Sequence, residues 1–215
     1  VRWDASQRLA FEAIDDGTGH LAADYVDALR RVLDGSSEAA MKSQLLALPT
    51  EASIADRHAQ VGLVDVHAIH SAKMRVAAAL GTGLREELTD IVSAGMASTE
   101  VYAPSAAQIG QRALVHTALS LLVASDASWL AKARELYFAA TNLSDRLCAA
   151  RLVVHHGDEV HRAEVLQHFF DRWKSENLVV NQWFVMQSTR PAPSAVQDVI
   201  ALTEHEAFDW RNPNK

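Results

Sequence analysis

Residues 105–124 read SAAQIGQRALVHTALSLLVA, and this stretch carries the strongest fold signal in the chain. Its apolar residues recur at i, i+4, i+7 and i+8, and so form one stripe along a helix: Leu114, Ala118, Leu121 and Leu122. Ser105 stands at its start with Gln108 three residues later, a spacing typical of a capped helix start. The stretch predicts an amphipathic helix that buries its stripe against other elements.

Helix-forming residues dominate the rest of the chain as well. Only 9 glycines and 5 prolines occur in 215 residues, and alternation of period two is almost absent. The spacing at Ser105 recurs at Ser53 and Ser194, which predicts two further helix starts. Stop signals are Gly17-Thr18-Gly19, Gly35, Pro49, Gly81-Thr82-Gly83, Pro104, Gly157 and Pro191. The predicted helices span 3–14, 20–33, 37–48, 53–60, 65–80, 84–96, 105–124, 127–140, 144–156, 159–175, 179–188 and 194–204.

Short loops between these helices favour antiparallel neighbours. We therefore expect an all-α fold of stacked antiparallel helical hairpins, an irregular α-superhelix of the ARM/HEAT-like solenoid type. A clean period of about 34 or 40 residues is missing, so a regular repeat family is not supported, and a layered bundle stays open. Because no linker-like stretch interrupts the pattern, residues 1–215 are expected to form a single helical domain.

Composition narrows the function classes. The net charge of −7 argues against a nucleic-acid partner, and no segment approaches the roughly 20 apolar residues of a membrane span. The lone Cys148 excludes an internal disulfide, and we expect it to be a small buried residue. The chain starts at Val1 without an initiator Met and is interpreted as an excised piece with cytoplasmic localisation.

The 10 histidines raise the question of a metal site. His156 and His161 flank an acidic pair, but a zinc helix needs histidines four apart with Glu directly after the first. Here the gap is five and Gly157 breaks the helix, so a polar loop is the better interpretation. His67 and His70 share a face without a nearby third ligand. His161, Glu164 and His168 also share a face, which we expect to be solvated.

Other chemistry finds no support in the sequence. No G-x-S-x-G elbow and no glycine-rich phosphate loop is present. The carboxylate pairs Asp15-Asp16 and Glu86-Glu87 are sequence neighbours, which point apart on a helix; carboxylates that meet only in space stay open. His205 is expected to interact with a helix end. We therefore predict no catalytic residue and no metal ligand in this chain.

The aromatic residues gather late in the chain, where helical spacing favours core packing over an exposed partner-binding patch. Three segments stand out: 169–173 (FFDRW), 177–188 (NLVVNQWFVMQS) and 205–214 (HEAFDWRNPN). Together they resemble the C-terminal region of bacterial aminopeptidase N, the alanyl aminopeptidases of the zinc gluzincin family. Matches continue upstream at 46–49, at 140–145 and at Arg2-Trp3, which opens the first helix, so the resemblance covers essentially the whole chain. The signature residues, to which we assign structural roles, are Trp173, Trp183, Phe184, Gln187, Phe208, Asn212, Pro213 and Asn214.

The resemblance implies a fold and a role. Members of this family are cytoplasmic zinc aminopeptidases that remove N-terminal residues from peptides. Their last domain is a helical superhelix that caps the active site and encloses the substrate chamber. The chain looks like that domain, truncated relative to the family, with no cofactor of its own because zinc belongs to the absent catalytic domain. Gln182 stands where the family commonly has Lys, and Glu206 where it often has Pro.

The resemblance also implies partners. These are the other domains of the parent aminopeptidase and, indirectly, its peptide substrates, with no nucleic acid and no membrane. We expect self-association of the isolated chain through Phe208 and Trp210, and a turn at Asn212-Pro213-Asn214. Two alternatives stay open. One is a free-standing α-solenoid that binds a protein or peptide. The other is an autonomous metal enzyme that uses His67, His70, His161 and His168.

Overall fold

The computed structural model describes residues 1–60 and 62–212, and over these it confirms the all-α prediction, since no strand occurs among them. None of the helices in this part of the chain is long and apolar enough to cross a bilayer. The helices are α1 (Arg2–Asp16), α2 (Ala23–Asp34), α3 (Ala39–Leu46), α4 (Glu51–Ala59), α5 (Val66–Gly83), α6 (Arg85–Met96), α7 (Ala106–Ser125), the 3₁₀ turn η1 (Ala127–Trp129), α8 (Leu130–Ala139), α9 (Leu143–His156), α10 (Glu159–Trp173), α11 (Asn177–Ser188) and α12 (Ala195–Thr203).

The chain divides into two compact units, unit 1 (Val1–Trp129) and unit 2 (Leu130–Lys215). Each unit stacks short helices, as the sequence pattern predicts. That residues 1–215 act as one domain stays a prediction.

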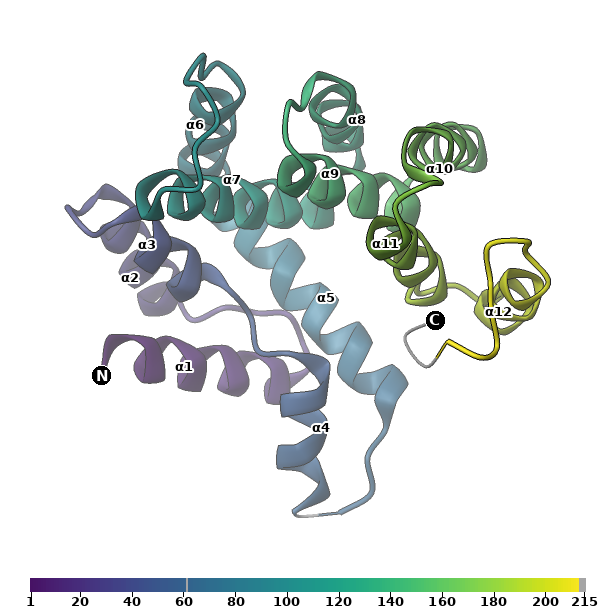
Figure 1. The fold of residues 1–215 in the computed structure, drawn as a ribbon. Helices are drawn as coiled ribbons and strands as arrows, with labels where there is room; N and C mark the ends of the chain where they lie inside the picture. The colour runs from purple at the N-terminus through teal and green to yellow at the C-terminus, as the bar shows by residue number, and fades with distance from the viewer. Residues whose placement is uncertain (61, 213–215) are drawn as a thin grey trace. The chain divides into compact units, whose positions relative to one another are not determined.

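Unit 1 is organised around α7, the helix on which the sequence argument rests. Helices α3, α5 and α6 all pack against it (Figure 1). The whole predicted stripe is buried: Leu114, Ala118, Leu121 and Leu122. Burying a leucine side chain is worth about 1.5–3 kcal/mol, so this stripe supplies much of the packing energy at the centre of the unit.

Gly81 corrects one predicted helix end. The sequence placed a stop at Gly81-Thr82-Gly83, but α5 continues through Gly83. A Cβ on Gly81 would lie only 2.1 Å from the backbone oxygen of Leu121 in α7. The glycine therefore permits close approach of two helices and does not end one of them.

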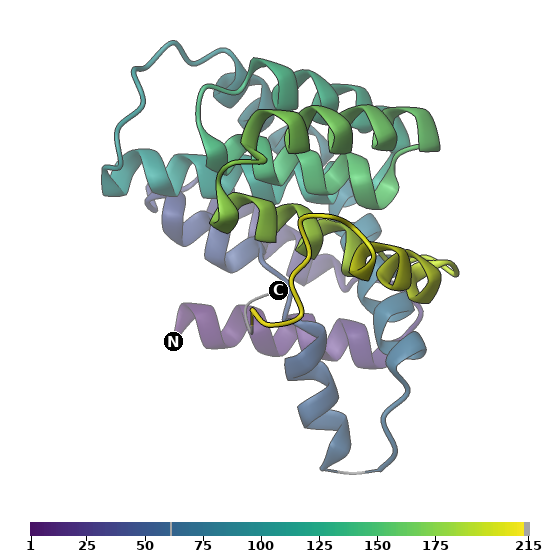
Figure 2. The same cartoon turned by 45° about the vertical axis from the view of Figure 1, so that its right-hand side comes forward.

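Unit 2 is a succession of helical hairpins. Helix α8 packs on α9, α9 on both α10 and α11, α10 on α11, and α11 on α12 (Figure 2). Loops of a few residues join these helices, as at Gly157 and Asp158 between α9 and α10. The prediction of stacked hairpins is confirmed here most directly.

Side-chain caps fix several helix starts. Of the three capping serines predicted from the sequence, Ser53, Ser105 and Ser194, one caps its helix through its side chain. Ser105 Oγ accepts a hydrogen bond from the Gln108 N–H at 3.3 Å, as predicted. At α4 the prediction is wrong, because Thr50 is the cap and accepts from the Ser53 N–H at 3.1 Å. Thr50 lies in extended backbone directly before Glu51, and so meets the free N–H groups first. Ser194 makes no cap bond to the backbone.

Candidate functional site

Five rings form an aromatic cluster where α10 and α11 meet the segment after α12. We use this name for Phe170, Trp183, Phe184, His205 and Phe208. Ring centroids lie 5.0 Å apart for Phe170 and Trp183, 4.9 Å for Trp183 and His205, and 5.7 Å for Phe184 and Phe208. Edge-to-face and tilted pairs at such distances stabilise by about 0.5–1.5 kcal/mol each beyond area burial. The aromatic cluster therefore holds the segment after α12 against the preceding hairpin.

Trp183 anchors the aromatic cluster. It is buried, and its Nε1–H donates to the backbone oxygen of Leu166 in α10 at 3.0 Å. One turn later, Gln187 Nε2 donates to the backbone oxygen of Trp183 at 3.1 Å. Trp173 stacks within α10 on Phe169, with centroids 4.4 Å apart. These three contacts join side chain to backbone or ring to ring, and none addresses solvent or a ligand.

The remaining signature residues lie near the C-terminal end. Phe208 is half-buried, whereas the Trp210 ring next to it is 76% exposed. The Asn212 N–H donates to the Asp209 backbone oxygen at 3.0 Å, which closes a turn. Pro213 and Asn214 lie outside the described residues, and so does the rest of the predicted Asn212-Pro213-Asn214 turn.

His205 differs from its prediction. The sequence suggested a helix-end cation, but the ring lies among Phe170, Trp183 and Phe184, with centroids within 5.9 Å. Its Nδ1 accepts a hydrogen bond from the Ala207 N–H at 3.1 Å. Helical periodicity could not reveal this contact, because His205 lies beyond α12, in a turn.

A second group, missed by the sequence analysis, centres on Arg146. This side chain is only 8% exposed, and its guanidinium lies 5.7 Å from the Tyr137 ring and 5.6 Å from the Trp173 ring. It donates to the Ala140 backbone oxygen. Burial lowers the pKa of Arg146, with the charge of Arg172 adding to the effect. Cation–π contacts offset part of the cost of burying such a charge.

His168 belongs to the same group, which corrects the prediction of a solvated face. Its Nδ1 lies 2.8 Å from the Tyr137 hydroxyl, and its ring packs edge-on against Phe138 at 5.2 Å. Burial lowers the pKa of His168, followed by the charges of Arg146 and Arg172. Glu164, on the same helix, forms an ion pair with Arg134 at 2.6 Å. His168 and Glu164, two of the three residues on the predicted face, thus have different partners.

His70 and His161 each lie beside a carboxylate. His70 Nδ1 lies 2.9 Å from Glu51, while His67 is exposed. His161 Nδ1 lies 2.7 Å from Asp158. Across residues 1–60 and 62–212, no three His, Cys, Asp or Glu side chains gather in a way that could hold a metal ion. The four histidines of the metal-enzyme alternative therefore do not converge.

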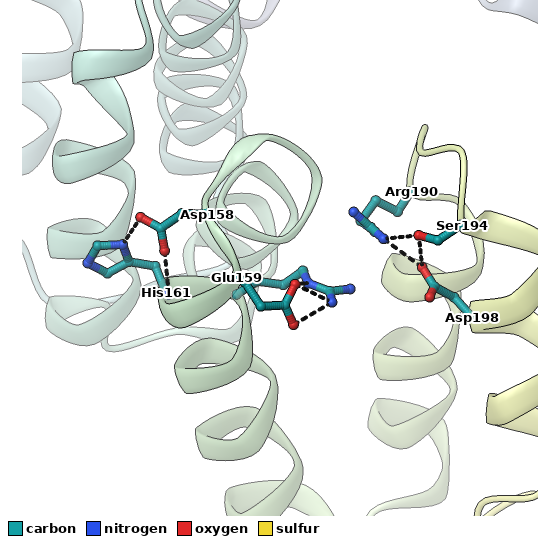
Figure 3. Close-up of polar contacts among 7 residues, drawn as sticks. Asp158, Glu159, His161, Arg190, Ser194 and Asp198 are labelled. Carbon is teal, nitrogen blue, oxygen red and sulfur yellow. Dashed lines mark hydrogen bonds and ion pairs between the residues drawn. The ribbon is translucent and has the colours of Figure 1, made fainter.

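The residues around the predicted His156–His161 loop stabilise the start of a helix. Asp158 Oδ1 accepts from the His161 N–H at 2.9 Å, and this hydrogen bond is the main cause of the lowered pKa of Asp158 (Figure 3). Glu159 pairs with Arg162 at 2.7 Å. Each contact joins two residues three positions apart at the start of α10. The interpretation of this segment as a polar loop between two helices therefore accounts for these charged residues.

Ser194 takes part in a comparable local cluster. Its hydroxyl donates to Asp198 at 3.2 Å, and Arg190 Nη2 donates to both Ser194 and Asp198, at 2.8 and 2.6 Å (Figure 3). The hydrogen bond from Arg190 is the main cause of the lowered pKa of Asp198. A nucleophilic serine needs a base that can take its proton. Here the neighbours are an arginine, which holds its proton, and a carboxylate bound to that arginine.

Cys148 is half-buried on α9, less than the full burial predicted from the sequence. The loss of solvent around its thiol raises the pKa of Cys148 to about 12. The thiol therefore stays protonated at neutral pH, which is unsuited to a nucleophile.

The fold and its structural sites define a class of helical-repeat domain. The family described as "Domain of unknown function (DUF3458_C) ARM repeats" matches residues 1–215, and the chain belongs to that family. Within it, the chain corresponds to a C-terminal domain of aminopeptidase N. The whole chain is 35% identical to aminopeptidase N of Caulobacter vibrioides and 28% identical to that of Escherichia coli. It spans about a quarter of the length of both relatives, 25% in each case.

A solved structure shows the same fold. Legionella pneumophila aminopeptidase A, crystallised in complex with aspartic acid, superposes with a TM-score of 0.86 at 20% identity. The match covers 99% of this chain and 26% of that one. The predicted family resemblance and the predicted ARM-like helical architecture are confirmed.

Proposed function

We propose that the chain is the non-catalytic helical domain of a zinc aminopeptidase, which caps the active site and encloses the substrate chamber. Zinc is held by a separate catalytic domain of the parent, which removes N-terminal residues from peptides in the cytoplasm. The observation that carries this proposal is the 35% identity to an aminopeptidase N along the entire chain, over only 25% of that protein's length.

The side chains within the chain are consistent with this role. His70, His161 and His168 pair with Glu51, Asp158 and Tyr137 respectively, and the signature aromatic residues pack helices together. Catalysis requires an acid, base or nucleophile positioned against a common reacting atom. Ser194 and the predicted histidines supply no such arrangement among the described residues.

A three-way comparison of hydrolysis tests the proposal. Alanyl-p-nitroanilide is offered, with zinc present, to the isolated chain, to the whole parent enzyme, and to the parent with residues 1–215 deleted. We expect hydrolysis by the whole parent alone, and recovery when the deleted parent is co-expressed with the chain. Hydrolysis by the isolated chain would overturn the proposal. So would a deletion that leaves kcat/KM unchanged for both this substrate and a longer peptide.

We further propose that the isolated chain self-associates through α12 and the segment after it. Val196, Val199 and Ile200 form one stripe on α12, with Val196 66% and Ile200 59% exposed, and Trp210 is exposed as well. No residue of α12 is buried. Exposed apolar faces of repeat helices drive association. Sedimentation velocity should show concentration-dependent oligomers, which Val196→Lys with Ile200→Lys removes. A monomer at all concentrations would contradict this.

A further inference from the structure

A cavity of about 490 Å³ opens in unit 1 between α1, α2 and the start of the α2–α3 loop. Its size is that of a site for a small organic molecule. Leu9, Leu29 and Leu45 give it apolar walls, and Arg2 and Arg31, both exposed to solvent, also line it.

The charge of this cavity is one-sided. Arg2 and Arg31 are the charged side chains that line it, and no carboxylate does so. Neither arginine forms an ion pair or side-chain hydrogen bond within residues 1–60 and 62–212. Two free guanidinium groups in a chain of net charge −7 favour an anionic group.

Arg30 shows the contrast on the same helix. It pairs with Asp27 at 2.7 Å and with Glu87 at 2.5 Å, and it also donates to the Gly83 backbone oxygen. Its neighbour Arg31 lines the cavity with no such partner. The two neighbouring arginines of α2 therefore differ, since Arg30 is neutralised by carboxylates and Arg31 is not.

Two polar groups of the cavity lining, Ser6 and Tyr25, stay neutral. Ser6 Oγ donates to the Leu45 backbone oxygen at 2.6 Å. Burial raises the pKa of Tyr25 to about 12, so this hydroxyl stays neutral. Apolar ligand atoms therefore fit the part of the cavity that the three leucines line.

We propose that the cavity binds an amphipathic carboxylate, with its hydrocarbon chain against the three leucines and its carboxylate on Arg2 and Arg31. This site goes beyond the aminopeptidase role, which does not depend on it. Both halves of the ligand are required. The hydrocarbon chain of the ligand gains hydrophobic burial, and its carboxylate gains charge-assisted hydrogen bonds.

Calorimetry with octanoate as the probe tests the site on the 215-residue chain. We expect saturable 1:1 binding of octanoate. Acetate and octanol should each bind at least about tenfold more weakly, because each lacks one half of the ligand. Arg2→Gln and Arg31→Gln should each weaken octanoate about tenfold. Arg8→Gln is the matched control, since Arg8 lies on α1 without lining the cavity. Circular dichroism checks that each variant is folded.

Two results would overturn the site. One is the absence of saturable octanoate binding to the folded chain. The other is octanoate binding that the double variant Arg2→Gln with Arg31→Gln leaves unchanged. Either result leaves the aminopeptidase role untouched, because that role is judged by hydrolysis in the parent enzyme.

Discussion

Unit 1 and unit 2 are both built of short stacked helices, but their interiors are made of different side chains. The buried core of unit 1 is aliphatic apart from Tyr25, and α7 lies at its centre. Unit 2 buries Tyr137, Phe169, Trp183 and Phe184, and with them the charged Arg146. In unit 1, helices approach closely at glycines, whereas in unit 2 rings and a guanidinium fill the space between helices.

This difference shows how one architecture tolerates two kinds of interior. Close approach depends on the absence of atoms, so added atoms should damage unit 1. Packing by large rings depends on volume, so removed atoms should damage unit 2. The half-buried His155 and His168 of unit 2 also make it sensitive to acid. Each statement can be tested with a single substitution or a change of pH.

The largest effect is expected when a ring is removed from unit 2. Phe169 is fully buried on α10, and Phe169→Ala should lower the free energy of unfolding of that unit by about 3–5 kcal/mol. Val165→Ala, at an equally buried position one turn earlier, should cost clearly less. Hydrogen exchange of unit 2 amides measures both. Equal losses would mean that rings have no special role there.

Gly81→Ala should have the next largest effect, in unit 1. The new Cβ would meet the Leu121 backbone oxygen, so α5 and α7 must separate, at a cost of about 1–3 kcal/mol. Gly62→Ala is the control, because a Cβ there meets no atom within 4 Å. Chemical denaturation, followed through the amides of unit 1, gives the free energy of unfolding of both variants and shows whether Gly81→Ala is the less stable. If both variants unfold alike, close approach does not govern this unit.

Acid should weaken unit 2 more than unit 1. Burial lowers the pKa of His155 and of His168, and His155 lies 2.9 Å from the Met186 backbone oxygen. The unfolded chain then binds protons more readily, so stability is present above the unfolded pKa of about 6.5 and is lost as pH falls through the lower folded values. Tyr25, with its pKa near 12, does not titrate in this range.

Amide exchange at pH 7 and pH 5 should therefore show protection lost chiefly in unit 2, after correction for intrinsic rates. The charges of Arg151, His156 and Arg190 act on His155 in the same direction as burial. His155→Gln should reduce the pH dependence of unit 2. An unchanged dependence, or an equal loss in unit 1, would refute this explanation.

The smallest effect concerns helix caps, in which the two units are alike. Thr50 caps α4 in unit 1 and Asn142 caps α9 in unit 2, through hydrogen bonds of 3.1 and 2.9 Å. Thr50→Ala and Asn142→Ala should each cost about 1 kcal/mol in thermal unfolding. Ser53→Ala should cost less, because the Ser53 hydroxyl caps no helix. If Ser53→Ala lowered the stability more than Thr50→Ala, Ser53 would be the cap of α4, as the sequence predicts.

The sequence predicts the helices well because their signals are local. The stripe on α7 and the cap at Ser105 both depend on residues within a few turns. Gly81 was misread as a stop because its role depends on Leu121, forty residues away on another helix. The contacts of His205 with Phe170 and of Arg146 with Trp173 likewise join distant residues. The cavity at Arg2 and Arg31 has the same origin, since it is lined from α1, α2 and α3 and forms only when α1 and α2 pack against α3.

Zinc content tests the central claim, that the chain is a domain without catalytic machinery of its own, most directly. The purified chain is dialysed against metal-free buffer, and zinc per chain is measured by elemental mass spectrometry. The account predicts close to no zinc, because His67, His70, His161 and His168 do not converge in the structure. About one zinc per chain, retained through dialysis, would contradict it and make the chain a metal site in its own right.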